Sequence, residues 1–143
     1  MGFYVNPAAD IGGMSQGSAK MKIRNKKGQP LPRQIDGMIQ QFVEQSLKAY
    51  APHIKRIILF GSYARGDFRE DSDIDVMVLV DYPREEMGRQ ISGLSHISYD
   101  ISYDNDFIEI NPIVQNVAFF EKWIQAYPFY NNVASEGIQL YGN

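Results

Sequence analysis

The stretch that decides the fold opens with Gly61-Ser62-Tyr63-Ala64-Arg65-Gly66 and, after a short polar spacer, closes with Ser72-Asp73-Ile74-Asp75-Val76. An apolar run, Ile57 to Phe60, precedes it, and a second apolar run continues from Ile74 to Val80. Short apolar runs on both sides of a polar turn predict two buried strands. The second strand carries aspartates at alternate positions, so both carboxylates project from the same face of the sheet.

The Gly61-Ser62 pair has the residue types that bind an anion after a strand. Glycine lets the backbone approach a phosphate, and Ser62 stands where a short helix would present its first N–H groups. Arg65, one turn later, can add charge-assisted hydrogen bonds to phosphate. A Gly-Ser pair alone is more often only a turn. Tyr63 and Phe68 flank it, and each is more simply explained by packing in the fold than by contact with a nucleobase.

Asp73 and Asp75 together predict a cation site. Bringing two like charges out of water is unfavourable unless cations neutralise them. Carboxylate oxygens suit Mg²⁺ shared with the phosphates of a substrate, and two such ions can clamp the attacking and leaving oxygens of a phosphoryl transfer. An Asp-x-Asp taken alone is more simply explained as the solvated start of a strand.

Combined at this spacing, the two halves resemble the signature of the DNA polymerase beta-like nucleotidyltransferase superfamily. The similarity is greatest to its minimal nucleotidyltransferases, bacterial and archaeal proteins often encoded beside a HEPN-domain partner. A looser likeness extends from about Ile35 to the C-terminus. The resemblance implies an α/β (α+β) fold with a mixed β-sheet flanked by helices. It also implies ATP or another nucleoside triphosphate as substrate and two Mg²⁺ ions.

The same resemblance assigns roles to individual residues. Gly61 and Ser62 are expected to hold the triphosphate, with Arg65 and Ser72 as further nucleotide-binding residues. Asp73 and Asp75 are expected to be catalytic and to hold both metal ions.

A third carboxylate from a later strand normally completes the metal site in this family. The apolar residues Ile97, Tyr99, Ile101 and Tyr103 alternate with polar ones, which predicts a strand. Asp100 lies in the middle of its polar face and is therefore expected to be the third catalytic and metal-binding carboxylate. Glu109 is the runner-up, and a solvated acid on an exposed face is the simpler reading of Asp100.

The remaining chain is divided into a flexible leader, residues 1–31, and a nucleotidyltransferase domain, residues 32–143. The leader is rich in glycine and lysine, and an ordered piece around Ile11 or Ile23 is left open. Apolar periodicity and turn residues predict further elements in the domain. These are a helix from Pro32 to Leu47, a helix from Asp81 through Leu94, a return strand from Phe107 to Val114 that forms a hairpin with Pro112 at an edge or bulge, helices at 117–127 and 128–136, and an extended end at 138–141.

Composition limits the classes of function. A chain of 143 residues that is 44% hydrophobic is long enough for one core. The net charge of −3 argues against nucleic acid as a partner, and the absence of cysteine excludes disulfides, thiolate metal sites and a cysteine nucleophile. The apolar runs are too short to span a membrane, so a cytoplasmic protein is expected.

The leading functional prediction is Mg²⁺-dependent transfer of a nucleotidyl group, most simply AMP from ATP, to a hydroxyl. The family resemblance suggests a tyrosine of a HEPN-type toxin as acceptor, which would make the chain an antitoxin. One alternative is a non-catalytic module that neutralises a partner by contact, and another is transfer to a small molecule such as an antibiotic. Self-association is left open. Three converging carboxylates would favour an enzyme, whereas an outward Asp100 with Glu109 also turned away would favour a binding protein.

Overall fold

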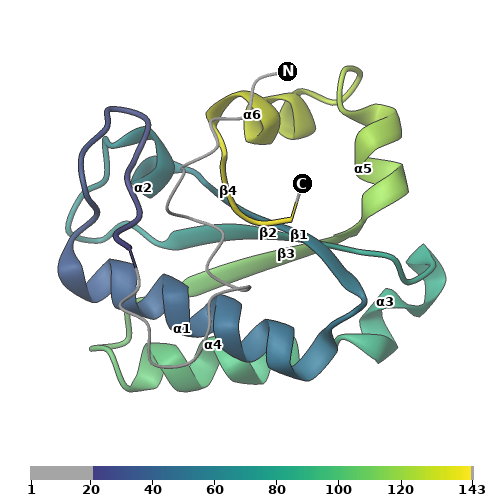
Figure 1. Ribbon diagram of the computed structural model, residues 1–143, viewed down its shortest axis with the longest axis horizontal. Coiled ribbons are helices and arrows are strands. Elements are labelled where there is room, and N and C mark those ends of the chain that lie inside the picture. The colour runs from purple at the N-terminus through teal and green to yellow at the C-terminus, as the bar shows by residue number, and fades with distance from the viewer. Residues whose placement is uncertain (1–20, 143) are drawn as a thin grey trace.

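A computed structural model describes residues 21–142 and shows a four-stranded sheet between two layers of helices (Figure 1). The strands lie in the order β3-β2-β1-β4. Their bounds are β1 Ile54–Phe60, β2 Ile74–Val80, β3 Ile110–Asn116 and β4 Ile138–Tyr141. β1 pairs antiparallel with both β2 and β4, whereas β2 and β3 run parallel. The predicted mixed sheet is therefore confirmed.

Each face of the sheet has its own helices (Figure 1). Helices α1 (Arg33–Tyr50) and α4 (Leu94–Tyr103) cover one face, and α5 (Val117–Trp123) and α6 (Pro128–Glu136) cover the other. Alternate residues of β2 divide between the two cores: Val76 and Val78 pack in the core with α1, whereas Met77 and Leu79 pack in the core with α6. By the same alternation Asp75 lies on the α6 face of the sheet.

The predicted strand at 97–103 is wrong, because these residues belong to helix α4. The buried residues of α4 are Leu94, Ser98, Ile101 and Ser102, which recur at helical spacing, while Tyr99 and Tyr103 are about 60% exposed. The serines lie on the buried side, and the Ser98 hydroxyl donates a hydrogen bond to the Leu94 carbonyl at 3.1 Å. Small polar residues facing the core produced the misleading alternation.

The predicted hairpin at 107–114 is also wrong. The strand there is β3, and it runs parallel to β2 after a crossover through α3 (Arg84–Gln90) and α4. Pro112 lies in an edge strand, as expected for a residue that cannot donate a ladder hydrogen bond. The helix predicted from Asp81 through Leu94 is divided, since α3 ends at Gln90 and α4 begins at Leu94.

Residues 1–20 of the predicted leader lie outside the described residues, and the remainder packs on the domain. Ile23 is fully buried, and its N–H donates to the Asp36 carboxylate of α1 at 2.7 Å. The N–H of Lys26 donates to the Ala64 carbonyl of α2 (Ser62–Arg65) at 2.8 Å. The segment 21–31 therefore bridges α1 and α2.

Within residues 21–142, none of the helices combines the length and the apolar character needed to cross a membrane.

Candidate active site

The phosphate-type turn predicted at Gly61-Ser62 joins β1 to the short helix α2. Gly61 has φ +78°, and a Cβ atom there would collide with the Asp75 carboxylate. Glycine is required on both counts. Backbone hydrogen bonds from Arg65 to Gly61 at 3.0 Å and from Gly66 to Ser62 at 2.8 Å close the turn. The backbone at Gly61 thus lies directly against one of the two predicted metal-binding aspartates.

Asp75 is the half-buried member of the aspartate pair. It pairs with Phe60 of β1 on one side and Asn111 of β3 on the other. Burial raises the pKa of Asp75 above its ordinary value, and the nearby Asp73 charge adds to the rise. A hydrogen bond from Asn111 and the charge of Arg65 oppose it. The balance leaves a carboxylate whose charged form would be favoured by a cation.

Asn111 of β3 stands beside both aspartates. Its side-chain N–H donates to Asp73 Oδ2 at 3.2 Å. The residue facing the aspartate pair from the neighbouring strand is therefore an amide and not an acid. Among residues 21–142 no group of three or more His, Cys, Asp or Glu residues could hold a metal ion. Two carboxylates with an amide oxygen nearby are nevertheless hard donors that fit Mg²⁺, which commonly uses one or two protein carboxylates together with substrate phosphates.

Neither acid proposed as the third carboxylate joins this pair. Asp100 is exposed on α4, not on a strand beside β2, so the geometric basis for its predicted catalytic and metal-binding role is absent. Glu109 is also exposed; its backbone carbonyl accepts a hydrogen bond from the Ile74 N–H at 2.9 Å. This contact places Glu109 just before β3, two residues ahead of Asn111.

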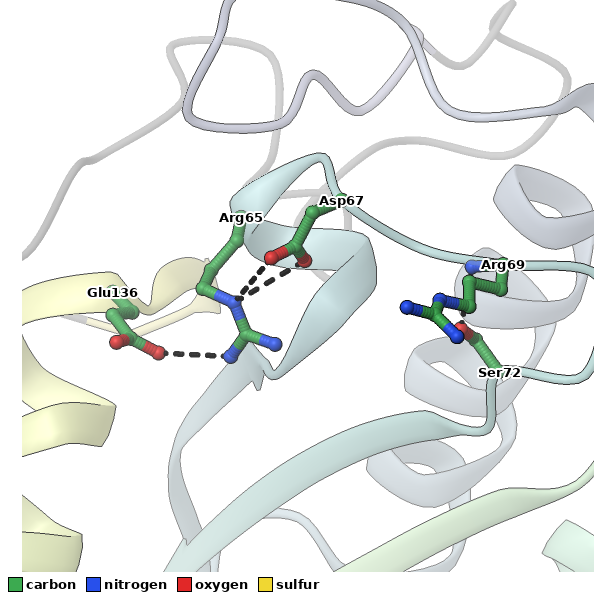
Figure 2. Close-up of polar contacts among 5 residues, drawn as sticks. All are labelled: Arg65, Asp67, Arg69, Ser72 and Glu136. Atoms are coloured by element: carbon green, nitrogen blue, oxygen red, sulfur yellow. Dashed lines mark hydrogen bonds and ion pairs between the residues drawn. The ribbon is translucent and has the colours of Figure 1, made fainter.

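Arg65 is held between two acids (Figure 2). Its Nε lies 3.2 Å from the Asp67 carboxylate, and its Nη1 lies 3.1 Å from Glu136 of α6. Burial alone would lower the pKa of Arg65, but hydrogen bonds to Asp67 and Glu136 raise it above its ordinary value. The guanidinium is thus positioned beside the turn, in exposed ion pairs weak enough to exchange for phosphate.

Ser72 shapes the loop that leads to the aspartates. Its hydroxyl accepts a hydrogen bond from the Arg69 N–H at 2.7 Å (Figure 2). This contact closes the turn immediately before Asp73.

A cavity of about 330 Å³ lies between the Gly61 turn and α6. Gly61, Ser62, Arg65 and Asp75 line one side, and α6 supplies the other through Phe129, Asn132 and Glu136. Sequence reasoning did not assign these α6 residues to the site. The run Phe129-Tyr130-Asn131-Asn132 stands out in the sequence as an aromatic and amide cluster. Which of its side chains reach the Gly61 turn depends on how α6 packs.

Comparison with known proteins identifies the family of this chain. A model of the nucleotidyltransferase domain family matches residues 39–130, which include the turn, both aspartates and β3. The chain belongs to the nucleotidyltransferase domain family.

Two relatives from Methanocaldococcus jannaschii are each named as a candidate protein adenylyltransferase. One is 38% identical over 103 residues, covering 72% of this chain and 94% of the relative. The other is 32% identical over 108 residues, covering 75% and 99%.

Solved structures give more distant likenesses. A toxin–antitoxin crystal structure with AMP-PNP matches with a TM-score of 0.45 and 20% identity, over 71% of this chain and 72% of that chain. A candidate nucleotidyltransferase from Sulfolobus solfataricus matches with a TM-score of 0.45 and 16% identity, over 90% and 94%. These likenesses are too distant to support a functional argument.

Proposed function

We propose that this nucleotidyltransferase transfers AMP from ATP, with Mg²⁺, to a hydroxyl group of a partner protein. The observation that carries the proposal is the half-buried Asp75, which lies against the Gly61 turn with Asp73 beside it. The names of the two archaeal relatives support a protein as the acceptor.

The groups at the turn and on β2 have separate roles in this reaction. Backbone N–H groups following Gly61, with the Ser62 hydroxyl, bind the triphosphate, and Arg65 exchanges its contacts with Asp67 and Glu136 for phosphate oxygens. Asp73 and Asp75 would hold Mg²⁺, which supplies charge neutralisation for the phosphates. The acceptor oxygen attacks the α-phosphorus of ATP. The bond between that phosphorus and the oxygen that bridges the α- and β-phosphates breaks, and pyrophosphate leaves.

The amide at position 111 supports a particular kind of acceptor. Among residues 21–142 no further acid joins Asp73 and Asp75 in a group that could hold a metal ion, so this reaction is best served by an acceptor whose proton leaves readily. A phenol, with a pKa of about 10, releases its proton to solvent more easily than an alkyl hydroxyl does. This supports tyrosine as the acceptor. The further identification of the partner as a HEPN-type toxin rests on the resemblance of the Gly61–Asp75 motif.

The test is transfer of label from α-labelled ATP to a co-purified HEPN-type partner in the presence of Mg²⁺. Label should appear on a tyrosine of the partner and should be lost with a chelator or with Asp75→Ala. Absence of transfer from the wild-type chain, or transfer unaffected by Asp75→Ala, contradicts the proposal.

A non-catalytic antitoxin is the second candidate, favoured by the exposure of Asp100 and Glu109. It predicts that the double variant Asp73→Ala, Asp75→Ala still neutralises the partner. Loss of neutralisation in a double variant that still binds the partner would eliminate this candidate.

A further inference from the structure

We infer that α6 supplies the nucleoside half of the cavity, with the base stacked on Phe129 and one base edge hydrogen-bonded to Asn132. The inference rests on the proposed function and adds to it the residues that select the nucleotide. The cavity then holds a whole nucleotide, with phosphates at the Gly61 turn and the base at α6.

The position of Phe129 relative to the turn is the first reason. Its ring meets Phe60 edge-on, with centroids 5.6 Å apart and an interplanar angle of 78°. Phe60 immediately precedes Gly61, so Phe129 lies beside the point where the phosphates would bind. Phe129 is 43% exposed although it lines the cavity, so part of its surface remains for a ligand. Stacking on such a ring is a common means of holding a base.

Tyr63 and Phe68, the two aromatic residues that the sequence offered as nucleobase contacts, stack on each other. Tyr63 is only 4% exposed, and its ring stacks on Phe68 with centroids 4.7 Å apart. Neither of the two lines the cavity. Phe129 is therefore the better candidate for a base contact.

Asn132 supplies the polar contact. This residue is exposed at the cavity, and its side chain makes no hydrogen bond within residues 21–142. The Ser135 hydroxyl donates to its backbone carbonyl at 3.3 Å and leaves the side-chain amide open. The amide offers a donor and an acceptor side by side. Adenine presents the matching pair, an amino donor next to a ring-nitrogen acceptor.

The face of α6 links this contact to the phosphate end. Phe129, Asn132 and Glu136 recur at positions i, i+3 and i+7, which lie on one side of a helix. Glu136 pairs with Arg65. The distance along α6 from Phe129 to Glu136 is about 10 Å, which is the scale of a nucleotide. One face of α6 therefore extends from the proposed base contacts, Phe129 and Asn132, to Glu136, which pairs with the phosphate-binding Arg65.

The first experiment compares binding of AMP-PNP and of inorganic tripolyphosphate, each with Mg²⁺, by calorimetry. Phe129→Ala should weaken AMP-PNP binding about 10-fold and leave tripolyphosphate binding unchanged, since only the nucleotide has a base to stack. Unchanged tripolyphosphate binding also shows that the variant is folded. The matched control is Phe107→Ala, which removes a 64% exposed ring outside the cavity and should change neither affinity.

The second experiment measures base preference. Asn132→Asp replaces a donor–acceptor pair with two acceptors, which suit the adjacent N–H donors of guanine. The ratio of AMP-PNP to GMP-PNP affinity should fall at least several-fold. The neighbouring Asn131→Asp makes the same change of charge outside the cavity and should leave the ratio unchanged.

The outcomes separate this inference from the proposed function. If wild-type protein binds AMP-PNP and neither Phe129→Ala nor Asn132→Asp alters affinity or preference, the nucleoside subsite is wrong and the proposed function stands. If wild-type protein binds neither AMP-PNP nor tripolyphosphate, the proposed function falls, and the subsite falls with it.

Discussion

At the scale of single residues, Asp75 lies in an environment that disfavours its charged form. It is partly withdrawn from water, has Asp73 two positions away, and receives only partial compensation from Asn111 and Arg65. A carboxylate in this state stabilises a ligand complex more than it stabilises the free fold.

The raised pKa of Asp75 predicts a pH dependence of stability. Its pKa in the folded state lies above the ordinary value for an aspartate, so the native state binds the proton more tightly than the unfolded chain does. The free energy of unfolding should therefore fall as pH rises from about 4 through the folded pKa. Asp75→Asn should remove this component and raise the Tm at pH 7. Urea titrations across pH would check it, with the exposed Asp71→Asn as control; matching profiles for Asp75→Asn and wild type would contradict it.

Asn111 leads to a second prediction. Asn111→Asp places a third carboxylate beside Asp73 and Asp75, which should lower the Tm in a chelator by like-charge repulsion. The same change should strengthen Mg²⁺ binding about 10-fold, because hard cations favour carboxylate ligands. Calorimetric titration with Mg²⁺ measures this directly. Asn131→Asp, with the same charge change elsewhere, should bind Mg²⁺ as wild type does; equal gains in both variants would refute the local explanation.

Gly61 gives a steric prediction. Gly61→Ala should cost about 1–3 kcal/mol of unfolding free energy, since its Cβ would meet Asp75 and its φ is positive. Gly88→Ala is the matched control, because it lies within α3 with open space around it. That change should stabilise by about 0.5–1 kcal/mol. Chemical denaturation measures whether each substitution lowers or raises the free energy of unfolding. An unchanged free energy of unfolding for Gly61→Ala would show that the turn tolerates a side chain.

Local patterns explain which site residues could be predicted. Gly61, Ser62, Asp73 and Asp75 lie within 15 residues of one another, so spacing along the chain is enough to place them together on the sheet. Asn111 and Asn132 reach the same place only through the register of β3 and the packing of α6. Such long-range placement is not encoded in any short window of sequence.

At the scale of elements, α4 shows how a polar–apolar alternation can mislead. A helix that packs closely on α1 can bury small serines as easily as apolar residues, provided that their hydroxyls are hydrogen-bonded. The four apolar residues from Ile97 to Tyr103 therefore do not share one buried face. Helix α1 was predicted because its apolar residues recur at helical spacing, although Asp36, Gln40 and Ser46 are buried among them.

Substitutions in residues 94–103 distinguish the helix α4 from the strand that the sequence pattern predicted. Ile101→Ala should cost about 2–5 kcal/mol, because Ile101 is 1% exposed in the core. Tyr99→Ala should change the unfolding free energy by about 0.5 kcal/mol or less, since its side chain is 61% exposed. In a strand both residues would lie on the same face and both losses would be large. Urea denaturation of the two variants decides between the alternatives.

At the scale of the whole molecule, the described part of the N-terminal segment belongs to the core. Ile23 and Leu31 are buried in the same cluster as α1 and β2, ahead of the residues that the family model matches. The sequence left an ordered piece at Ile23 open but could not decide it, because isolated apolar residues in a glycine- and lysine-rich segment do not form a period.

Ile23→Ala should therefore destabilise the fold by about 2–5 kcal/mol. Met21→Ala, two residues earlier and 59% exposed, should have little effect. Thermal unfolding of both variants measures the difference. Equal Tm values for Ile23→Ala and wild type would show that the segment is dispensable to the core.

The two outer strands determine how a partner can approach the sheet. β3 contains Pro112, which removes a donor, and β4 has only four residues. Short or proline-bearing edges resist strand addition and edge-to-edge aggregation. Recognition by extending the sheet with a foreign strand is therefore disfavoured at both sides. If the acceptor is a hydroxyl of a partner protein, as proposed, that partner would contact side chains on the helical surfaces. Its specificity would then depend on those side chains and not on backbone pairing.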